Sequence, residues 1–296
     1  MTASVQRLDA ARPAAAADTA VLAFPKPAGP LIDISAVGLA VARTVVPPLV
    51  VAALLLMLWQ IACAGPGAFL PPPSQVWQEA GELIWSPFFD YGQSDVGLGW
   101  RVITSLQRVA LGFGLAAAVG VLVGAFVGQS IWAMRGLDPI FQILRTVPPL
   151  AWLPLSLAAF RDSHPSAIFV IFITSVWPVL INTAVGVRNI PQDYRNVARI
   201  LRLNPVEFFF KIMIPSAAPY IFTGLRIGVG LSWLAIVAAE MLTGGVGIGF
   251  FIWDAWNSSR LPDIIVALAY IGVVGFVLDR LVAGLGAVVT RGTAAS

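Results

Sequence analysis

Charged side chains inside apolar stretches are the groups in this chain whose type and position suit a chemical role. The sequence has 296 residues, of which 11% are charged and 58% are hydrophobic. A charge at the centre of a membrane helix costs roughly 2.5 to 3.5 kcal/mol on insertion scales, so it tends to face protein or water. Arg226 and Glu240 lie in the apolar run 220–242. Helical rise separates them by about 21 Å, so they cannot pair directly.

These two residues leave several uses open. Arg226 either extends to the inner membrane surface or offers a forked donor to an anion. Glu240 lies near the outer end of the run. Three uses are open to it there: gating a path, pairing with a neighbouring subunit, or simply reaching water. Ser232 and Trp233 lie between them and are weaker candidates for lining a translocation path.

Catalysis by this chain is not expected. The sequence contains no glycine-rich loop ending in Gly-Lys-Ser or Gly-Lys-Thr, and Cys63 and His164 are its single cysteine and single histidine. A nucleotide site of that kind needs the glycine-rich loop, and a metal or nucleophile site needs several Cys, His or carboxylate side chains close together. We therefore predict a non-enzymatic chain with no catalytic residue, no metal and no cofactor of its own.

A basic amphipathic segment, residues 188–219, separates two apolar runs and is far longer than a connector needs to be. Asp193 is placed to cap a helix over 194–203, and Asn204-Pro205 ends that helix and starts a second one that stops near Ile214-Pro215. We call this segment the elbow. Its pattern alone fits a helix lying on anionic lipid as well as a protein-docking loop.

The elbow resembles the coupling loop of ABC importer permeases. The family pattern is Glu-Ala-Ala, three residues, Gly, nine residues, Ile, one residue and Leu-Pro. Ala198, Ile212 and Pro215 agree with it, whereas Asn196 replaces the glutamate and Arg202 the glycine. The nitrate-type branch of the family shows the same departures. Segments 148–154, 182–187, 219–228, 231–242 and 244–249 are similar to that branch too, so the resemblance covers about 100–279.

The resemblance implies a machine of several parts. Two permease copies face each other, each elbow sits in a cleft of a cytoplasmic ATPase that binds ATP and Mg²⁺, and an external protein delivers the solute. Phe208, Phe209 and Phe210 would be apolar plugs, with Arg199, Arg202 and Lys211 as ionic contacts and Glu207 as a counter-charge. The expected coupling residues are Asn196, Ala198, Arg199, Arg202, Glu207, Phe208, Phe209, Phe210, Lys211, Ile212 and Pro215.

The same resemblance suggests a small inorganic anion as cargo, with nitrate or nitrite first. Cyanate, bicarbonate, taurine and alkanesulfonate are alternatives that use the same machinery. A secondary transporter or channel whose elbow rests on lipid is an alternative of another class.

The apolar runs predict an all-α integral membrane protein with about six spans, and the resemblance implies the type-I ABC importer permease fold. The runs are 42–62, 106–127, 140–160, 167–187, 220–242 and 264–285. Arg145, Pro148 and Pro149 in the third run predict a kinked or partly re-entrant helix. Glycines at four-residue spacing in the second and fifth runs predict that these two helices form the centre of the bundle.

The distribution of Lys and Arg sets the expected orientation, with both termini on the cytoplasmic side of a bacterial inner membrane. No interaction with nucleic acid is expected. The expected divisions are a disordered Ala/Pro-rich cytoplasmic tail (1–35), a first transmembrane helix (36–64), an outer segment (65–100), a transmembrane domain (101–285) containing the elbow (188–219), and a C-terminal cytoplasmic tail (286–296).

Overall fold

A computed structural model describes residues 34–65, 67–92 and 95–291, with side chains from Arg43 onward. The expected tail 1–35 lies outside this part except for its last two residues, and so do residues 292–296. The chain divides into two units, 1–55 and 56–296, which are described separately. The described part of the first unit is the beginning of α1 (Ile34–Cys63), an apolar helix containing Pro47 and Pro48.

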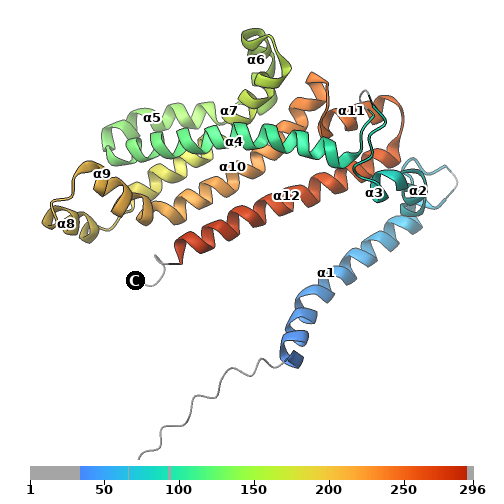
Figure 1. The fold of residues 1–296 in the computed structure, drawn as a ribbon, viewed down its shortest axis with the longest axis horizontal. Coiled ribbons are helices and arrows are strands. Elements are labelled where there is room, and N and C mark those ends of the chain that lie inside the picture. Colours follow the sequence, from blue (N-terminus) through green and yellow to red (C-terminus); the bar gives the residue numbers. More distant parts are fainter. Residues whose placement is uncertain (1–33, 66, 93–94, 292–296) are drawn as a thin grey trace, which may run out of the picture. The chain divides into compact units, whose positions relative to one another are not determined.

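Four long helices run side by side in the second unit: α4 (Leu98–Gln129), α7 (Ser163–Arg188), α10 (Ile214–Thr243) and α12 (Leu261–Thr290) (Figure 1). Together with α1, the described residues form five helices long and apolar enough to cross a membrane. A bent pair makes a sixth, which agrees with the six predicted runs. Several helices outlast their runs, since hydropathy marks only the lipid-facing length. The outer segment therefore gives way to α4 at Leu98, and α12 continues to Thr290.

The third predicted run is the bent pair. It comprises α5 (Ile131–Leu144), the short η1 (Pro149–Trp152) and α6 (Leu153–Phe160), and the bend measures 92°. Pro148 and Pro149 carry no backbone N–H and cannot continue the helical hydrogen-bond ladder. The prediction of a kinked or partly re-entrant helix is confirmed.

Short helices join the long ones. The outer segment contains α2 (Pro73–Glu79) and α3 (Gly81–Trp85), and α11 (Ile248–Asn257) connects α10 to α12. The elbow contains α8 (Gln192–Ile200), α9 (Pro205–Phe208) and the π-helical turn η2 (Phe209–Met213). A single antiparallel bridge, Asp90 to Val96, is the extended pairing found in the described residues.

Helix α7 forms the centre of the bundle, packed between α4 and α10. A Cβ atom at Gly124 of α4 would lie 2.5 Å from the carbonyl oxygen of Leu180, and one at Gly224 of α10 would lie 2.8 Å from that of Pro178. Val179, fully buried, lies between these contacts on α7. The glycines therefore do admit close neighbours. The prediction that the second and fifth helices together form the centre was wrong, because both glycine faces pack on α7.

A buried polar network joins α4, α10 and α11. The fully buried carboxylate of Glu240 accepts a hydrogen bond from Arg108 Nη1 at 2.7 Å, and the hydroxyl of Ser105 lies 2.8 and 2.9 Å from its two oxygens. The backbone N–H of Gly249 donates to Glu240 Oε2 at 3.1 Å, and that of Ile248 donates to Ser105 Oγ. The charge is thus paired and hydrogen-bonded, which is the condition under which a buried carboxylate is tolerated.

The glycine contacts can be tested on one helix. Gly124→Ala should lower the thermal stability of the purified protein in detergent by about 1–3 kcal/mol, because the added methyl overpacks the contact with α7. Gly114→Ala is the matched control, since a Cβ there meets nothing within 4 Å. Equal melting temperatures for the two variants would contradict the close packing of α4 on α7.

The polar network can be tested by a double-mutant cycle. Glu240→Gln should destabilise the protein by roughly 3–5 kcal/mol, the usual cost of removing one partner of a buried ion pair. Adding Arg108→Gln should restore part of that loss, since no uncompensated charge then remains. Additive losses in thermal unfolding would show that the two residues do not interact.

Candidate functional site

The first arm of the elbow, α8, ends in a Schellman turn. The N–H of Leu203 donates to the carbonyl of Ala198 and the N–H of Arg202 to that of Arg199, both at 3.1 Å. Arg202 has a φ of 49°, the left-handed conformation that glycine adopts with least strain. Arg202 stands where the importer pattern has glycine, so the backbone geometry accounts for the glycine in that pattern.

The start of α8 differs from the prediction. The helix begins at Gln192 with Pro191 at its N-cap, and Asp193 lies inside its first turn. The negative charge of Asp193 interacts favourably with the positive end of the helix dipole there. Asp193 does not cap the helix, so the predicted cap was wrong. The helix ends at Ile200 instead of Leu203, because the left-handed Arg202 ends the helical conformation.

The second arm begins as predicted and ends differently. Asn204 caps α9, and the side chain of Glu207 accepts in return from the Asn204 N–H. Glu207 also pairs with Lys211, 2.8 Å from Oε1 to Nζ. The predicted end near Ile214-Pro215 was wrong: residues 205–243 form one continuous helical segment. The π turn η2 widens the helix just before Pro215, whose ring clashes with a regular preceding turn.

The three phenylalanines of the elbow do not share one role. Phe208 and Phe209 pack against a buried cluster that includes Val187 and Met213, whereas Phe210 is 66% exposed. The most exposed apolar side chains of the elbow are Ile200, Leu201, Val206 and Phe210, and Val197 and Tyr194 are exposed as well. Sequence reasoning missed Ile200, Leu201 and Val206, although helical spacing from the buried Ala198 would have placed Ile200 on the opposite, outer face.

Arginines surround a cavity of about 400 Å³ beside this turn. It is lined by Arg195, Ala198, Arg199, Arg202, Leu203, Pro205 and Phe208. Arg195 donates to the carbonyl of Val187, while Arg199 and Arg202 are exposed. Asn196 is exposed as well, and Ile212 and Pro215 are half-buried. The elbow thus brings together most of its predicted residues around an exposed, cationic and partly apolar face.

Arg226, a predicted path residue, is already paired. Its Nη2 lies 2.7 Å from Asp279 Oδ2 on α12, and Arg226 lines a cavity of about 240 Å³ between α10 and α12. The ion pair differs from both predicted uses of Arg226. The side chain is held by Asp279 instead of extending alone to the membrane surface, and an anion would have to compete with Asp279 for it. Asp279 was missed, although it lies inside the predicted run 264–285 where any ionised residue is informative.

The other three path candidates are interior. Glu240 belongs to the network with Arg108, so the structure contradicts the expectation that it reaches water or a neighbouring subunit. The Ser232 hydroxyl donates to the Gly228 carbonyl, and the Trp233 indole N–H donates to the Ile271 carbonyl. Ser232 and Trp233 therefore offer no free polar group in this conformation, and their place on a path stays a prediction. Arg108 was also missed, inside the run 106–127.

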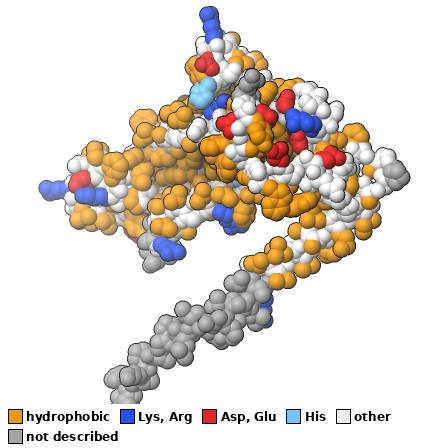
Figure 2. All heavy atoms as spheres, turned by 45° about the vertical axis from the view of Figure 1, so that its right-hand side comes forward, with side chains coloured by type: hydrophobic (Ala, Val, Ile, Leu, Met, Phe, Trp, Pro, Cys, Tyr) orange, Lys and Arg blue, Asp and Glu red, His pale blue; other side chains and the backbone are white. Residues whose placement is uncertain are grey.

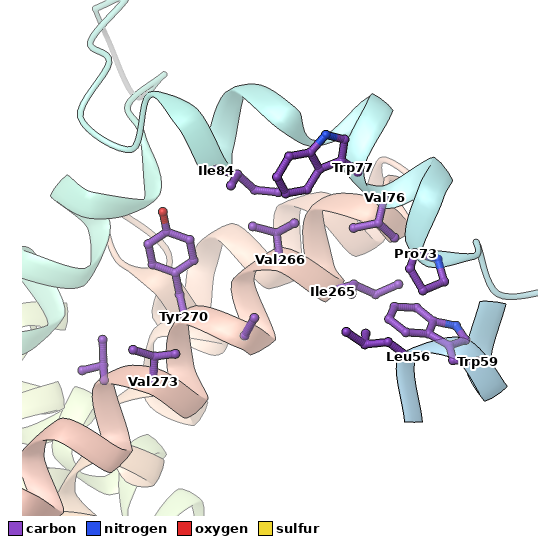
Figure 3. Close-up of a pocket in the computed structure, with 12 residues that line it drawn as sticks. Leu56, Trp59, Pro73, Val76, Trp77, Ile84, Ile265, Val266, Tyr270 and Val273 are labelled. Carbon is purple, nitrogen blue, oxygen red and sulfur yellow. The ribbon is translucent and has the colours of Figure 1, made fainter. Parts of the chain in front are cut away.

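The second unit also contains a large apolar cavity, of about 430 Å³ (Figure 3). Its walls are formed by Trp59, Trp77 and aliphatic side chains of α12. Tyr270 also lines it, and the Tyr270 hydroxyl donates to the Leu83 carbonyl. These walls carry no charge and do not suit a small anion. Among the described residues, no group of three or more His, Cys, Asp or Glu side chains is arranged to hold a metal ion.

Charges gather at the two ends of the second unit. Figure 2 shows Lys and Arg side chains at the elbow, a mixed group of acidic and basic side chains toward the opposite end, and hydrophobic side chains over much of the surface between them. In the outer segment Tyr91 donates to Glu82 Oε1 at 2.6 Å, and this hydrogen bond and the carboxylate charge raise the pKa of Tyr91. An apolar belt between charged ends is the expected surface of a membrane-spanning protein.

Comparisons with known proteins agree with this architecture. Residues 116–291 match the family model described as binding-protein-dependent transport system inner membrane component. The chain is 59% identical to the nitrate import permease protein NrtB of Synechocystis sp. over 245 residues, 83% of this chain and 89% of the relative. It is 53% identical to the bicarbonate transport system permease protein CmpB of the same organism over 251 residues, 84% of this chain and 90% of the relative.

Solved structures support the fold. The inward-facing MetNI methionine ABC transporter superimposes with a TM-score of 0.59 at 15% identity, covering 66% of this chain and 96% of that chain. Identity this low shows the fold alone. The family model spans more than half of the chain and the relatives span most of it. The chain is therefore a multi-pass inner-membrane permease of the binding-protein-dependent ABC importer family.

Proposed function

We propose that this permease carries nitrate or nitrite into the cell. The observation that carries the proposal is its 59% identity to a nitrate import permease over 83% of the chain. A bicarbonate permease at 53% identity over a similar length makes bicarbonate the second candidate. Nitrate and bicarbonate are both small planar oxyanions with one negative charge, so one kind of path suits either.

The remaining machinery follows from the family. Cytoplasmic ATPase subunits would bind ATP and Mg²⁺, a second copy of this chain would complete the membrane part, and an external binding protein would deliver the anion. The elbow and both termini would then lie on the cytoplasmic side. The basic elbow supports this orientation, because Lys and Arg are retained inside.

The elbow is built to pass a displacement into the membrane. Its outer face combines Ile200, Leu201 and Val206 with the exposed Arg199 and Arg202, a mixture suited to docking in a protein cleft. Its second arm is continuous with α10. A helix transmits rigid-body motion better than a flexible loop, so movement of the docked elbow would rotate or shift α10 against α7. Different contacts in the two states are what couple ATP hydrolysis to transport.

Docking can be tested at Arg202 without disturbing the turn. Arg202→Gly keeps the left-handed backbone, relieves strain and removes the guanidinium. We expect the amount of ATPase that co-purifies with the permease to fall at least fivefold. Arg161→Gly is the matched control, since Arg161 also has a positive φ, 54°, but ends α6, outside the elbow. Unchanged ATPase recovery with Arg202→Gly would remove the ionic role assigned to Arg202.

The cargo can be tested in cells. Deletion of this gene should abolish high-affinity uptake of ¹⁵N-nitrate in a strain without a second nitrate transporter, and plasmid-borne wild type should restore it. Uptake of ¹³C-bicarbonate serves as the parallel measurement. Normal nitrate uptake together with lost bicarbonate uptake would favour the second candidate instead.

A further inference from the structure

One arginine inside the membrane part is unlike the others. Arg108 pairs with Glu240, and Arg226 pairs with Asp279. Arg145 is exposed at the end of α5, and among the described residues no carboxylate or carbonyl accepts from its guanidinium. The break that follows α5 fixes this position, because Pro148 and Pro149 stop the helix and the chain turns by 92°.

Two adjoining cavities meet at Arg145. They measure about 330 and 120 Å³, and they share Arg145, Thr174, Trp177 and Leu231. The larger extends to Asn182 of α7, and the smaller extends to η1. Neither has a carboxylate among its lining residues. Asp138, on the same helix, is about 10 Å from Arg145 by helical rise and does not line them.

The cavities lie midway along the helices that form them. Trp177 is about 21 Å from the start of α7 and about 17 Å from its end by helical rise. Leu231 is about 26 Å from the start of α10 and about 18 Å from its end. A cation at this depth is costly without a partner, which favours a mobile anion as that partner.

The donors suit a planar oxyanion. The guanidinium of Arg145 is a planar fork that meets two oxygens of such an anion at once. Asn182 donates one amide N–H to the Pro178 carbonyl and keeps a second. The indole N–H of Trp177 has no acceptor among the described residues. All three groups line the larger cavity, whose volume of about 330 Å³ leaves room for a small anion and water.

We propose that Arg145, with Trp177 and Asn182, forms a transient binding site for a planar oxyanion halfway across the membrane. The proposal rests on the proposed import of nitrate or bicarbonate and names where the permease itself holds the anion. It assigns the path's positive charge to Arg145 instead of Arg226, whose charge Asp279 neutralises.

Uptake by the complete transporter tests the site. Arg145→Gln should lower ¹⁵N-nitrate uptake at least tenfold while the permease still co-purifies with its ATPase. Arg145→Lys should keep part of the rate with a raised KM, because an ammonium is a point donor without the fork. Arg135→Gln, an exposed arginine on the same helix outside both cavities, is the matched control and should transport like wild type.

A labelling experiment tests the site with Arg145 intact, in case its replacement prevents assembly. Cys63 is the single cysteine, so Thr174→Cys in a Cys63→Ser background provides one thiol in the cavity. Millimolar nitrate should slow its reaction with a small cationic methanethiosulfonate at least threefold in the purified complex, and equimolar gluconate should not.

The outcomes separate the two proposals. Wild type that takes up neither nitrate nor bicarbonate would overturn the proposed function. Nitrate uptake by the wild type together with unchanged uptake by Arg145→Gln would overturn the site alone, and so would labelling that neither nitrate nor bicarbonate slows. Protection by bicarbonate but not nitrate would support the site and assign it to the second candidate cargo.

Discussion

Close packing of α7 against both α4 and α10 is the constraint on which the rest of this subunit depends. Apolar surface gives no net drive for association within lipid, so helices in a membrane are held by close van der Waals contact and by polar pairs. Glycines at the crossing points bring backbones near enough for such contact, and Val179 fills the space between them. The buried pair of Arg108 and Glu240 then fixes α4 to α10 near the end opposite the elbow.

This arrangement gives α10 two connected functions. At one end it is continuous with the arm of the elbow that carries the capping box, and along its length it forms a wall of the cavities at Arg145. A displacement imposed at the elbow therefore reaches the cavity wall without passing through a loop. Packed interfaces tend to have discrete arrangements, so a shift of α10 on α7 can change which side of the membrane the cavity meets.

Much of the fold could be predicted from the sequence because the bilayer restricts the choices. Six apolar runs and the proline break at 148–149 were sufficient for the helices and the bend. Hydropathy does not encode which helix packs on which, so the central place of α7 was missed. The sequence Asn204-Pro205 was sufficient to predict the start of the second helix, whereas the N-cap of α8 is Pro191, two positions before the predicted Asp193.

The site residues were predicted less completely, for a related reason. A charge in an apolar run shows that a partner exists but not which one, and Arg226 and Glu240 were considered without Asp279 and Arg108. Arg145 was read as part of a kink, since its lack of a partner is a property of the folded arrangement. In the elbow, amphipathic spacing found the segment but could not tell inward phenylalanines from outward ones.

Transport by purified components tests the central claim most directly. Proteoliposomes containing the permease, its ATPase and the external binding protein, with ¹⁵N-nitrate on the side of the binding protein, should accumulate nitrate only when MgATP is present on the ATPase side. Uptake should stop when any one component is omitted. Nitrate movement down its gradient by the permease alone, at the same rate with or without MgATP, would contradict the account and indicate a channel or secondary transporter.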